Sequence, residues 1–321
     1  MPESFSHIPV LPNEVVELLD PQPGEVYIDC TAGLGGHAVM IAQKVGPAGT
    51  IVLNDMDEGN LERAEAAVRD QMAPQSPESA NVVAIRGNFA QLPQELVKRG
   101  ILADMVLADL GFASTQVDDP ERGLSFRHSG PLDMRMDRSA PVDAAELVNT
   151  LPEKEIGDLI KHFGEERHGR RIARKIVEAR ELAPIETTDQ LADLIRSAVP
   201  YSKGPRSSIH PATRTFQALR IAVNDELGSL QLLLRSVGIG VKKLRSGEQG
   251  WLSDGARIAM IAFHSLEDRP VKQSFARMNE EGLVELVTRK PVGAQDDEIG
   301  NNPRSRSAKM RVCRVLGSAA G

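Results

Sequence analysis

A carboxylate and a group of glycines follow the first apolar run of the chain. The run V-Y-I at residues 26–28 leads directly into D-C-T-A-G-L-G-G-H-A at residues 29–38. Glycine adopts backbone conformations that a Cβ forbids, and a ligand can lie against bare main-chain N–H groups at the start of a helix. This segment therefore predicts a nucleotide-cofactor loop. Gly33, Gly35 and Ala38 also fit the dinucleotide fingerprint G-x-G-x-x-A, so the loop alone is compatible with a nicotinamide enzyme and with a methyltransferase.

Asp29 helps to distinguish these two cofactor classes. The pyrophosphate of a dinucleotide is negative and is best bound by amides that have no carboxylate beside them. S-adenosylmethionine instead has a cationic amino group and a sulfonium, both of which a carboxylate attracts. Asp29 therefore favours S-adenosylmethionine. The alternative is an Asp that only caps the turn through hydrogen bonds to nearby backbone, which is a common role of this residue type.

Acidic and aromatic side chains also follow the next three apolar runs. Asp55 is placed to accept hydrogen bonds from both ribose hydroxyls of a nucleotide, whereas Asp57 can equally start the next helix. Phe89, in G-N-F-A, can line an adenine pocket or serve as a core residue at a strand end. Asp109 ends M-V-L-A-D, and ligands of open α/β sheets bind beyond the carboxyl ends of the strands. We therefore expect Asp29, Asp55 and Asp109 to face one crevice.

The elements that position these residues alternate between strand and helix through the first third of the chain. This alternation is typical of a parallel, doubly wound sheet. The expected strands are residues 26–28, 50–53, 81–85 and 105–108, and the expected helices are about 38–45, 58–71 and 91–99.

The alternation stops at about residue 116, and only helical patterns occur up to residue 209. The expected helices there are 144–151, 153–163, 171–180 and 188–199. A long amphipathic helix from Phe216 to Leu234 follows, and strand patterns return at residues 257–263, 284–288 and 310–315. We therefore predict an α/β fold in which residues 1–115 and 210–321 form a Rossmann-like domain. Residues 116–209 are predicted to be an inserted, all-helical substrate-recognition domain.

Composition excludes several classes of protein. The chain has 321 residues, and its hydrophobic content of 41% is ordinary for a globular protein. Its only cysteines, Cys30 and Cys313, and its seven histidines lack the spacing of a zinc site, so no metal is expected. No apolar run has the length of a membrane span, and the N-terminus lacks the pattern of a signal peptide, which predicts a cytoplasmic protein.

Charge is distributed unevenly along the chain. The net charge of −7, taken on its own, argues against a nucleic-acid partner. Residues 161–220, however, contain 12 Lys and Arg against seven Asp and Glu, a balance of +5 that leaves −12 for the remainder. A basic surface on an acidic body suits a protein that meets RNA in one place, although solvated helices with interleaved charges give the same count. The arginines considered for phosphate contacts are Arg127, Arg135, Arg167, Arg171, Arg174, Arg206, Arg214 and Arg220.

The fourth predicted strand ends in D-L-G-F-A-S-T-Q at residues 109–116. Methyltransferases of exocyclic base amines have Asp or Asn at this strand end, followed by Pro-Pro and an aromatic. The Asp or Asn serves as a hydrogen-bond acceptor for the base amine. It is needed because the lone pair of the amine is delocalised into the ring, and a hydrogen bond from the amine N–H rehybridises the nitrogen for attack. Here Asp109 is present, Leu110 and Gly111 replace the prolines, and Phe112 takes the aromatic place. The segment instead resembles D-L-G-[VI]-S-S-x-Q, the motif of the ribosomal RNA small subunit methyltransferase H family.

The resemblance extends over nearly the whole chain. Phe112 and Ala113 depart from it, because they stand where the family usually has a small aliphatic residue and a Ser. The other matching motifs, in the same order, are R-G-L-S-F-R-H-S-G-P-L-D-M-R-M-D (122–137), G-E-E-R (164–167), R-I-A-R-K-I-V (171–177), H-P-A-T-R-T-F-Q-A-L-R-I-A-V-N-D-E-L (210–227), F-H-S-L-E-D-R (263–269) and N-P-R-S-R-S-A-K-M-R (302–311).

The resemblance implies a metal-independent 16S rRNA (cytosine-N4)-methyltransferase that uses S-adenosylmethionine and modifies one cytidine of the decoding region. Its partner would be 16S rRNA or the small ribosomal subunit. Asp109 is the candidate catalytic residue, and His37 and Gln116 are assigned by the resemblance alone. Alternatives are an amino-methyltransferase of DNA or another RNA, a nicotinamide dehydrogenase, and a non-catalytic RNA-binding assembly factor. The implied cofactor contacts are Gly35, Gly36, His37, Asp55, Phe89, Asp109 and Gln116.

Overall fold

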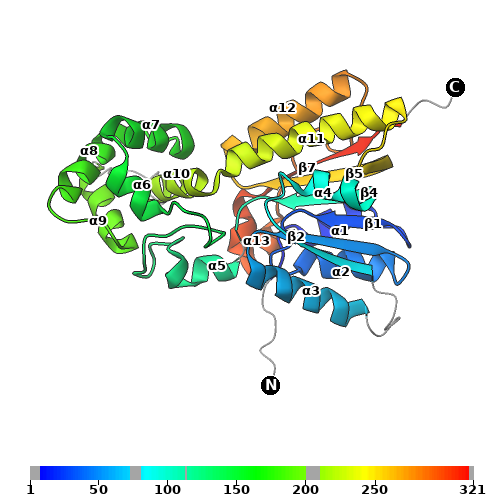
Figure 1. Cartoon of the computed structure of the whole chain (residues 1–321), viewed down its shortest axis with the longest axis horizontal. Coiled ribbons are helices and arrows are strands. Elements are labelled where there is room, and N and C mark those ends of the chain that lie inside the picture. Colours follow the sequence, from blue (N-terminus) through cyan, green and yellow to red (C-terminus); the bar gives the residue numbers. More distant parts are fainter. Residues whose placement is uncertain (1–7, 73–80, 113, 200–209, 318–321) are drawn as a thin grey trace. The chain divides into compact units, whose positions relative to one another are not determined.

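The computed structural model describes residues 8–72, 81–112, 114–199 and 210–317 (Figure 1). The chain divides into two compact units, which we consider separately. The first unit comprises Met1–Gly111 and Leu227–Gly321, and the second comprises Phe112–Glu226. The second unit is therefore longer at both ends than the segment 116–209 expected from the sequence.

The first unit is built on one seven-stranded sheet with the strand order β3-β2-β1-β4-β5-β7-β6. The first five strands in this order, β3, β2, β1, β4 and β5, pair in parallel. β7 is antiparallel to both of its neighbours, β5 and β6. This topology confirms the predicted α/β, Rossmann-like fold. The order reverses at β1 and β4, and such switch points are where doubly wound sheets bind ligands. The strands are β1 (Val26–Asp29), β2 (Thr50–Asp55), β3 (Asn81–Arg86), β4 (Ala103–Asp109), β5 (Leu252–Ala262), β6 (Val284–Leu286) and β7 (Lys309–Val315).

Helices cover both faces of this sheet (Figure 1). Successive strand residues point to opposite faces, so Tyr27 packs in one core cluster and Ile28 in the other. The Tyr27 face carries α1 (Pro12–Leu19), α2 (Gly36–Val45) and α3 (Glu58–Met72), and the Ile28 face carries α4 (Leu92–Arg99), α11 (Glu226–Ser246) and α12 (Ser265–Glu280). The unit also contains α13 (Asp296–Asn301) and a 3₁₀ turn, η2 (Pro303–Ser307). Within the described ranges, no helix combines the length and apolar composition needed to cross a membrane.

The second unit is helical and has its own core. Ile160, Ile172 and Ile195 pack together there with Phe216 and Leu219, and all five are almost fully buried. In the described part of this unit, the sole strand-like pairing is an isolated bridge between Pro131 and Thr187. The elements are α5 (Ser114–Asp118), η1 (Pro120–Arg122), α6 (Ala144–Thr150), α7 (Glu153–Gly164), α8 (Gly169–Arg180), α9 (Thr188–Ala198) and α10 (Thr213–Asn224).

The single long helix predicted from Phe216 to Leu234 is wrong. The structure has two helices instead, because Asp225 adopts a left-handed conformation with a φ of 46° between α10 and α11. Asp tolerates this conformation better than most residues. Phe216 of α10 belongs to the core of the second unit, whereas Leu230 of α11 belongs to that of the first. The boundary between the units therefore falls at this break and not at residue 209.

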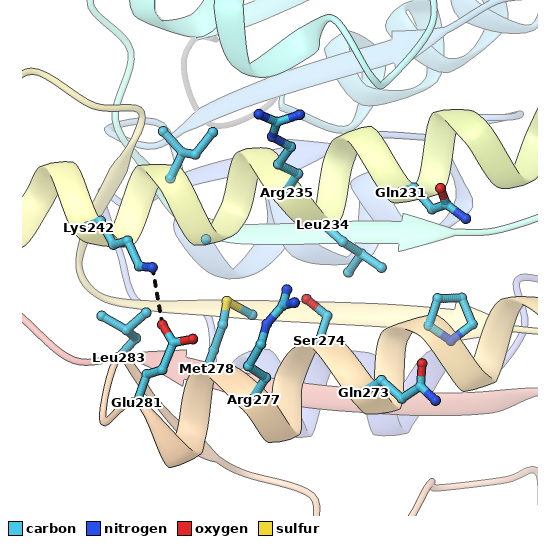
Figure 2. A pocket seen from close by; sticks show the side chains of 13 residues that line it. Gln231, Leu234, Arg235, Lys242, Gln273, Ser274, Arg277, Met278, Glu281 and Leu283 are labelled. Atoms are coloured by element: carbon cyan, nitrogen blue, oxygen red, sulfur yellow. Dashed lines mark ion pairs between the residues drawn. The ribbon is translucent and has the colours of Figure 1, made fainter.

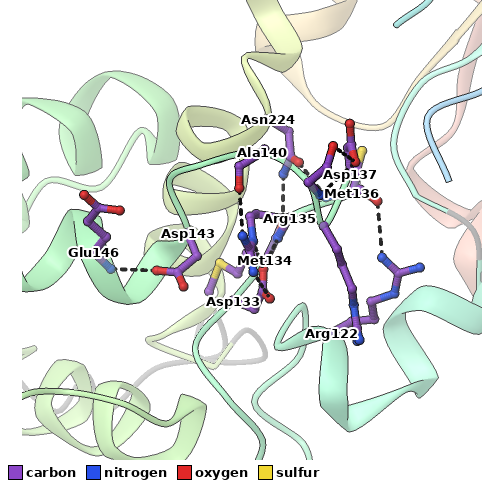
Figure 3. A network of polar contacts seen from close by, with 12 residues as sticks. Arg122, Asp133, Met134, Arg135, Met136, Asp137, Ala140, Asp143, Glu146 and Asn224 are labelled. Atoms are coloured by element: carbon purple, nitrogen blue, oxygen red, sulfur yellow. Dashed lines mark hydrogen bonds and ion pairs between the residues drawn. The ribbon is translucent and has the colours of Figure 1, made fainter. Parts of the chain in front are cut away.

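A polar network fixes the segment before α6 in the second unit (Figure 3). Arg135 donates to both carboxylate oxygens of Asp133, at 2.7 and 2.8 Å. Asn224, the last residue of α10, accepts from the Met136 N–H at 2.7 Å and donates to the Met134 carbonyl at 2.8 Å. Arg135 was considered for a phosphate contact, but its guanidinium is part of this internal network.

Candidate active site

The carboxyl ends of β2, β1 and β4 lie side by side, and the glycine loop after β1 is tied to both neighbours. The Gly33 N–H donates to Asp55 Oδ2 at 2.9 Å, and the Asp109 N–H donates to Thr31 Oγ1 at 2.8 Å. The loop that starts at Asp29 is thus held between Asp55 and Asp109. Thr31 was not predicted from the sequence, because its partner lies 78 residues away in the chain.

Gly35 and Gly36 are required by close approaches of the loop to its surroundings. Gly35 has a φ of 83°, and a Cβ there would lie 3.0 Å from Ala64 Cα and 3.2 Å from Ala64 O. A Cβ on Gly36 would lie 3.2 Å from the Pro9 side chain. Since the first N–H groups of a helix have no intrahelical partner, the start of α2 also presents donors at this point.

His37 and Asp109 bring unpartnered polar atoms together. His37 Nε2 lies 3.7 Å from Asp109 Oδ2. Both ring nitrogens of His37 and the Asp109 Oδ1 are buried and have no hydrogen-bond partner among the described residues. Buried polar atoms are normally hydrogen-bonded, so three exceptions at one place need a physical explanation. A bound ligand that hydrogen-bonds to these atoms supplies one.

Asp29 is buried close to this pair, with 2% of its surface exposed. It accepts hydrogen bonds from the Tyr27 hydroxyl at 3.0 Å and from the Thr31 N–H at 3.2 Å, so it does cap the turn. Burial raises the pKa of Asp29 to about 6, with a smaller contribution from the Asp109 charge, while His37 and the two hydrogen bonds oppose the shift. The carboxylate is mainly ionised at neutral pH and mainly protonated at pH 5.

Asp55 organises the backbone around the loop. Besides the Gly33 N–H, its carboxylate accepts the Asp57 N–H at 2.8 Å. Each carboxylate oxygen can accept more than one hydrogen bond, which is compatible with the predicted ribose contacts. Asp57 accepts the Asn60 N–H at 3.0 Å in the first turn of α3, and so takes the helix-starting role considered for it.

Phe89 and Asn88 lie in the loop after β3. Phe89 is half-buried and packs against the core on the α11 and α12 face. Asn88 accepts the Ala90 N–H at 2.9 Å and donates to Ser229 Oγ of α11 at 2.7 Å, so it holds this loop in place. Asn88 was missed in the sequence, although an Asn after a Gly at a strand end is a typical turn former.

Gln116 belongs to the second unit, where it is buried in α5. Its contact with the cofactor stays a prediction.

In the same unit Arg220 donates to the Glu226 carboxylate at 2.7 and 2.8 Å, and its guanidinium lies 4.5 Å from the centroid of the Phe112 ring. Arg220, like Arg135, is therefore held by internal partners. Arg206 lies outside the described residues.

A model of the MraW methylase family matches residues 4–316. The chain belongs to this family. Ribosomal RNA small subunit methyltransferase H of Symbiobacterium thermophilum is 46% identical over 325 residues, covering 96% of each chain. The protein of the same name from a Geobacter species is 46% identical, covering 98% of this chain and 100% of the relative. Among solved structures, TrmN from Thermus thermophilus is similar with a TM-score of 0.42 and 15% identity, covering 98% of this chain and 50% of that one.

Membership of the MraW methylase family confirms the resemblance noted from the motifs. The expected class, an S-adenosylmethionine-dependent methyltransferase, is confirmed with it. The nicotinamide dehydrogenase that the glycine loop alone allowed is thereby excluded. The residues at the switch point fit S-adenosylmethionine, since the loop offers carboxylates toward a cationic ligand and His37 and Asp109 hold unpartnered buried atoms.

The pKa of Asp29 leads to a prediction about cofactor affinity. A cationic ligand near Asp29 favours its ionised form, so binding below pH 6 must also displace a proton. We expect affinity for S-adenosylmethionine to rise up to about tenfold between pH 5 and 7. Asp29→Asn should weaken binding at pH 7 and abolish this rise. Titration calorimetry in two buffers of different ionisation enthalpy measures both affinity and proton release, and proton release that persists in Asp29→Asn would contradict the assignment.

Proposed function

We propose that this methyltransferase modifies the exocyclic N4 of one cytidine in the decoding region of 16S rRNA. The observation that carries the proposal is the unpartnered, buried Oδ1 of Asp109 at the carboxyl end of β4. A base amine needs an acceptor for its N–H at this position, and a carboxylate oxygen to which none of the described residues donates is suited to it. The names of the relatives support small-subunit rRNA as the substrate.

The proposed cofactor site combines the residues assigned from the sequence. Gly35 and Gly36 let the loop pack against Ala64 and Pro9, so that the N–H groups at the start of α2 face the ligand, and Asp55 accepts the ribose hydroxyls. Phe89 lines the adenine pocket, while His37, Asp109 and Gln116 provide polar contacts. When bound, S-adenosylmethionine supplies an electrophilic methyl group on a sulfonium.

The proposed reaction is an in-line transfer in which positioning matters more than a strong base. A C–N bond forms as the C–S bond breaks, and the amine nitrogen then releases one proton. Asp109 would hold the amine N–H and offset the positive charge that develops on nitrogen. The cytosine must be unpaired or flipped out of a helix, because N4 otherwise takes part in base pairing.

The second unit is proposed to bind the RNA. Arg170 and Arg171 at the start of α8 are exposed and have no hydrogen-bond or ion-pair partner among the described residues. Arg174 lies on the same helix, 3.9 Å from the exposed Glu153 carboxylate. A distance this long between exposed groups contributes little to stability, so all three guanidinium groups are available for phosphates.

Neutralising Arg170, Arg171 and Arg174 together with Gln should weaken RNA binding and lower its dependence on salt. Each lost phosphate contact reduces the slope of log K against log salt by about 0.7 to 0.9. Cofactor affinity should stay near normal. Fluorescence anisotropy with a 16S rRNA fragment at several salt concentrations measures the slope, with the exposed cations Lys98, Arg99 and Lys272 neutralised as the matched control. A folded variant with an unchanged slope would refute the assignment of this surface.

Mass spectrometry of 16S rRNA tests the proposed function directly. Nucleosides from cells that lack the protein should contain less N4-methylated cytidine than those from complemented cells. Fragment mapping should place the lost methyl group in the decoding region. A loss that maps to another base or to another RNA would overturn the proposal, while turnover of labelled cofactor on purified small subunits would separate an enzyme from an assembly factor.

A further inference from the structure

A groove lies between α11 and α12, entirely within the first unit. Its volume is about 450 Å³, which falls in the range of small-ligand sites. None of its lining residues is among those assigned to the cofactor or to the methylated base. Figure 2 shows that the lining side chains come from the two helices and from the turn that follows α12.

The floor of the groove is apolar. Leu234, Met278 and Leu283 form it, and all three are buried. Gly238 of α11 leaves the space above Met278 open, because a Cβ there would lie 3.7 Å from the Met278 sulfur. A flat ring could rest on such a floor, whereas a larger side chain at residue 238 would occupy the same space.

The charged groups along the groove are mainly cationic. Arg277 of α12 and Arg235 of α11 are exposed, line the groove, and have no ion-pair or hydrogen-bond partner among the described residues. Glu281 is the sole acidic residue of the lining. Its charge is offset because it pairs with Lys242 at 3.2 Å. The lining therefore has a net charge of +2 on a protein whose overall charge is −7.

Ser274 provides a second, independent observation. Its side chain is 6% exposed, and its hydroxyl has no hydrogen-bond partner in the described part of the chain. In Figure 2 the Ser274 hydroxyl and the Arg277 side chain both point from α12 towards α11. A buried hydroxyl without a partner costs about 1 to 3 kcal/mol, and a ligand oxygen beside Arg277 would remove that cost.

We propose that the groove between α11 and α12 binds one nucleotide of the rRNA substrate, separately from the methylated cytidine. Arg277, Arg235 and the Ser274 hydroxyl would hold the phosphate, and the apolar floor would contact the ribose or base. The cationic lining favours RNA over a partner with a basic or a purely apolar surface. This inference rests on the proposed function, because that function supplies the RNA. It adds a second anchoring point, which would fix the orientation of the substrate without reading its sequence.

Two variants test the groove by different physical routes. Arg235→Gln with Arg277→Gln removes both cationic contacts to this phosphate, and should weaken binding to protein-free 16S rRNA about tenfold and lower the salt slope by about 0.7. Gly238→Leu keeps every charge but fills the groove, and should weaken binding with little change of the slope. Lys272→Gln, on α12 but outside the groove lining, is the matched control and should bind normally. Circular dichroism and cofactor titration verify that each variant is folded.

The outcomes separate this inference from the proposed function. If wild-type protein methylates small subunits while both groove variants bind and methylate RNA normally, the groove assignment is wrong and the proposed function stands. If the variants weaken binding to small subunits but not to protein-free 16S rRNA, the groove binds a ribosomal protein and the RNA assignment fails. Saturable binding of adenosine 5′-monophosphate, with no effect of the variants on RNA, would instead identify a site for free nucleotides.

Discussion

Replacing Asp109 by Asn is expected to lower the single-turnover methylation rate on the order of 10²-fold. Asn keeps the shape of the side chain but lacks the charge that offsets the positive nitrogen during transfer. The buried Oδ1 has no hydrogen-bond partner among the described residues, so the substitution should not break a side-chain hydrogen bond within them. If Asp109 also contacts the cofactor, the affinity for S-adenosylmethionine should fall as well.

Cofactor affinity and single-turnover rate should be measured on the same Asp109→Asn protein. Asp104→Asn is a suitable control, because Asp104 lies on the same strand and its carboxylate accepts the Val26 N–H at 2.8 Å. An amide oxygen at residue 104 can still accept that bond, so near-normal kinetics are expected. Normal affinity and a normal rate for Asp109→Asn would show that Asp109 merely ends the strand.

Gly35→Val should abolish cofactor binding. The residue has a φ of 83°, which is unfavourable for Val by at least about 1 to 2 kcal/mol, and its Cβ would approach the Ala64 backbone at 3.0 to 3.2 Å. The loop can relieve both effects only by moving, and it would then lose its hydrogen bond between the Gly35 N–H and the Ala32 carbonyl, at 2.8 Å. Titration calorimetry with S-adenosylmethionine measures the loss.

Gly46→Val provides the matched control for this prediction. Gly46 ends α2 with a φ of 65°, but a Cβ there has no neighbour within 4 Å. With a ψ of −170° the residue is at least as unfavourable for Val as Gly35, but it makes no clash in the cofactor loop, so the variant should bind the cofactor normally while losing thermal stability. Gly35→Ala extends the test if Gly35→Val does not fold. Equal binding losses at residues 35 and 46 would show that general destabilisation is responsible.

The strands of the sheet could be predicted because buried parallel strands are continuous apolar runs. The residues at which a strand begins or ends were harder to predict where polar residues interrupt the apolar run. The prediction began β5 at residue 257, whereas the strand starts at Leu252, because S-D-G interrupts the apolar pattern where β4 pairs irregularly with β5. α12 was missed although Val271, Phe275 and Met278 follow helical spacing, since Pro270 and several charged residues obscure it. α1 was also missed, although Val15 and Leu19 follow helical spacing.

The site was predictable to a different degree for different residues. Asp55 and Asp109 could be placed at one crevice because they end parallel strands. The role of Thr31 and Asn88 could not, since each bonds a partner that is distant in sequence and close only after folding. The sequence also cannot reveal that both nitrogens of His37 lack a hydrogen-bond partner in the described part of the chain, because that depends on every neighbour of the ring.

The position of β7 within the sheet has a consequence for biosynthesis. β7 is the last strand in the chain, yet it lies between β5 and β6 and not at an edge. The sheet therefore cannot close until residues 309–315 have left the ribosome. Phe112–Glu226 is one continuous segment with its own core, so it can fold while the first unit still awaits its C-terminal strands. A nascent chain of this methyltransferase thus exposes the unpaired edge of β5 until residues 309–315 emerge, and an unpaired strand edge is a site where other chains can pair.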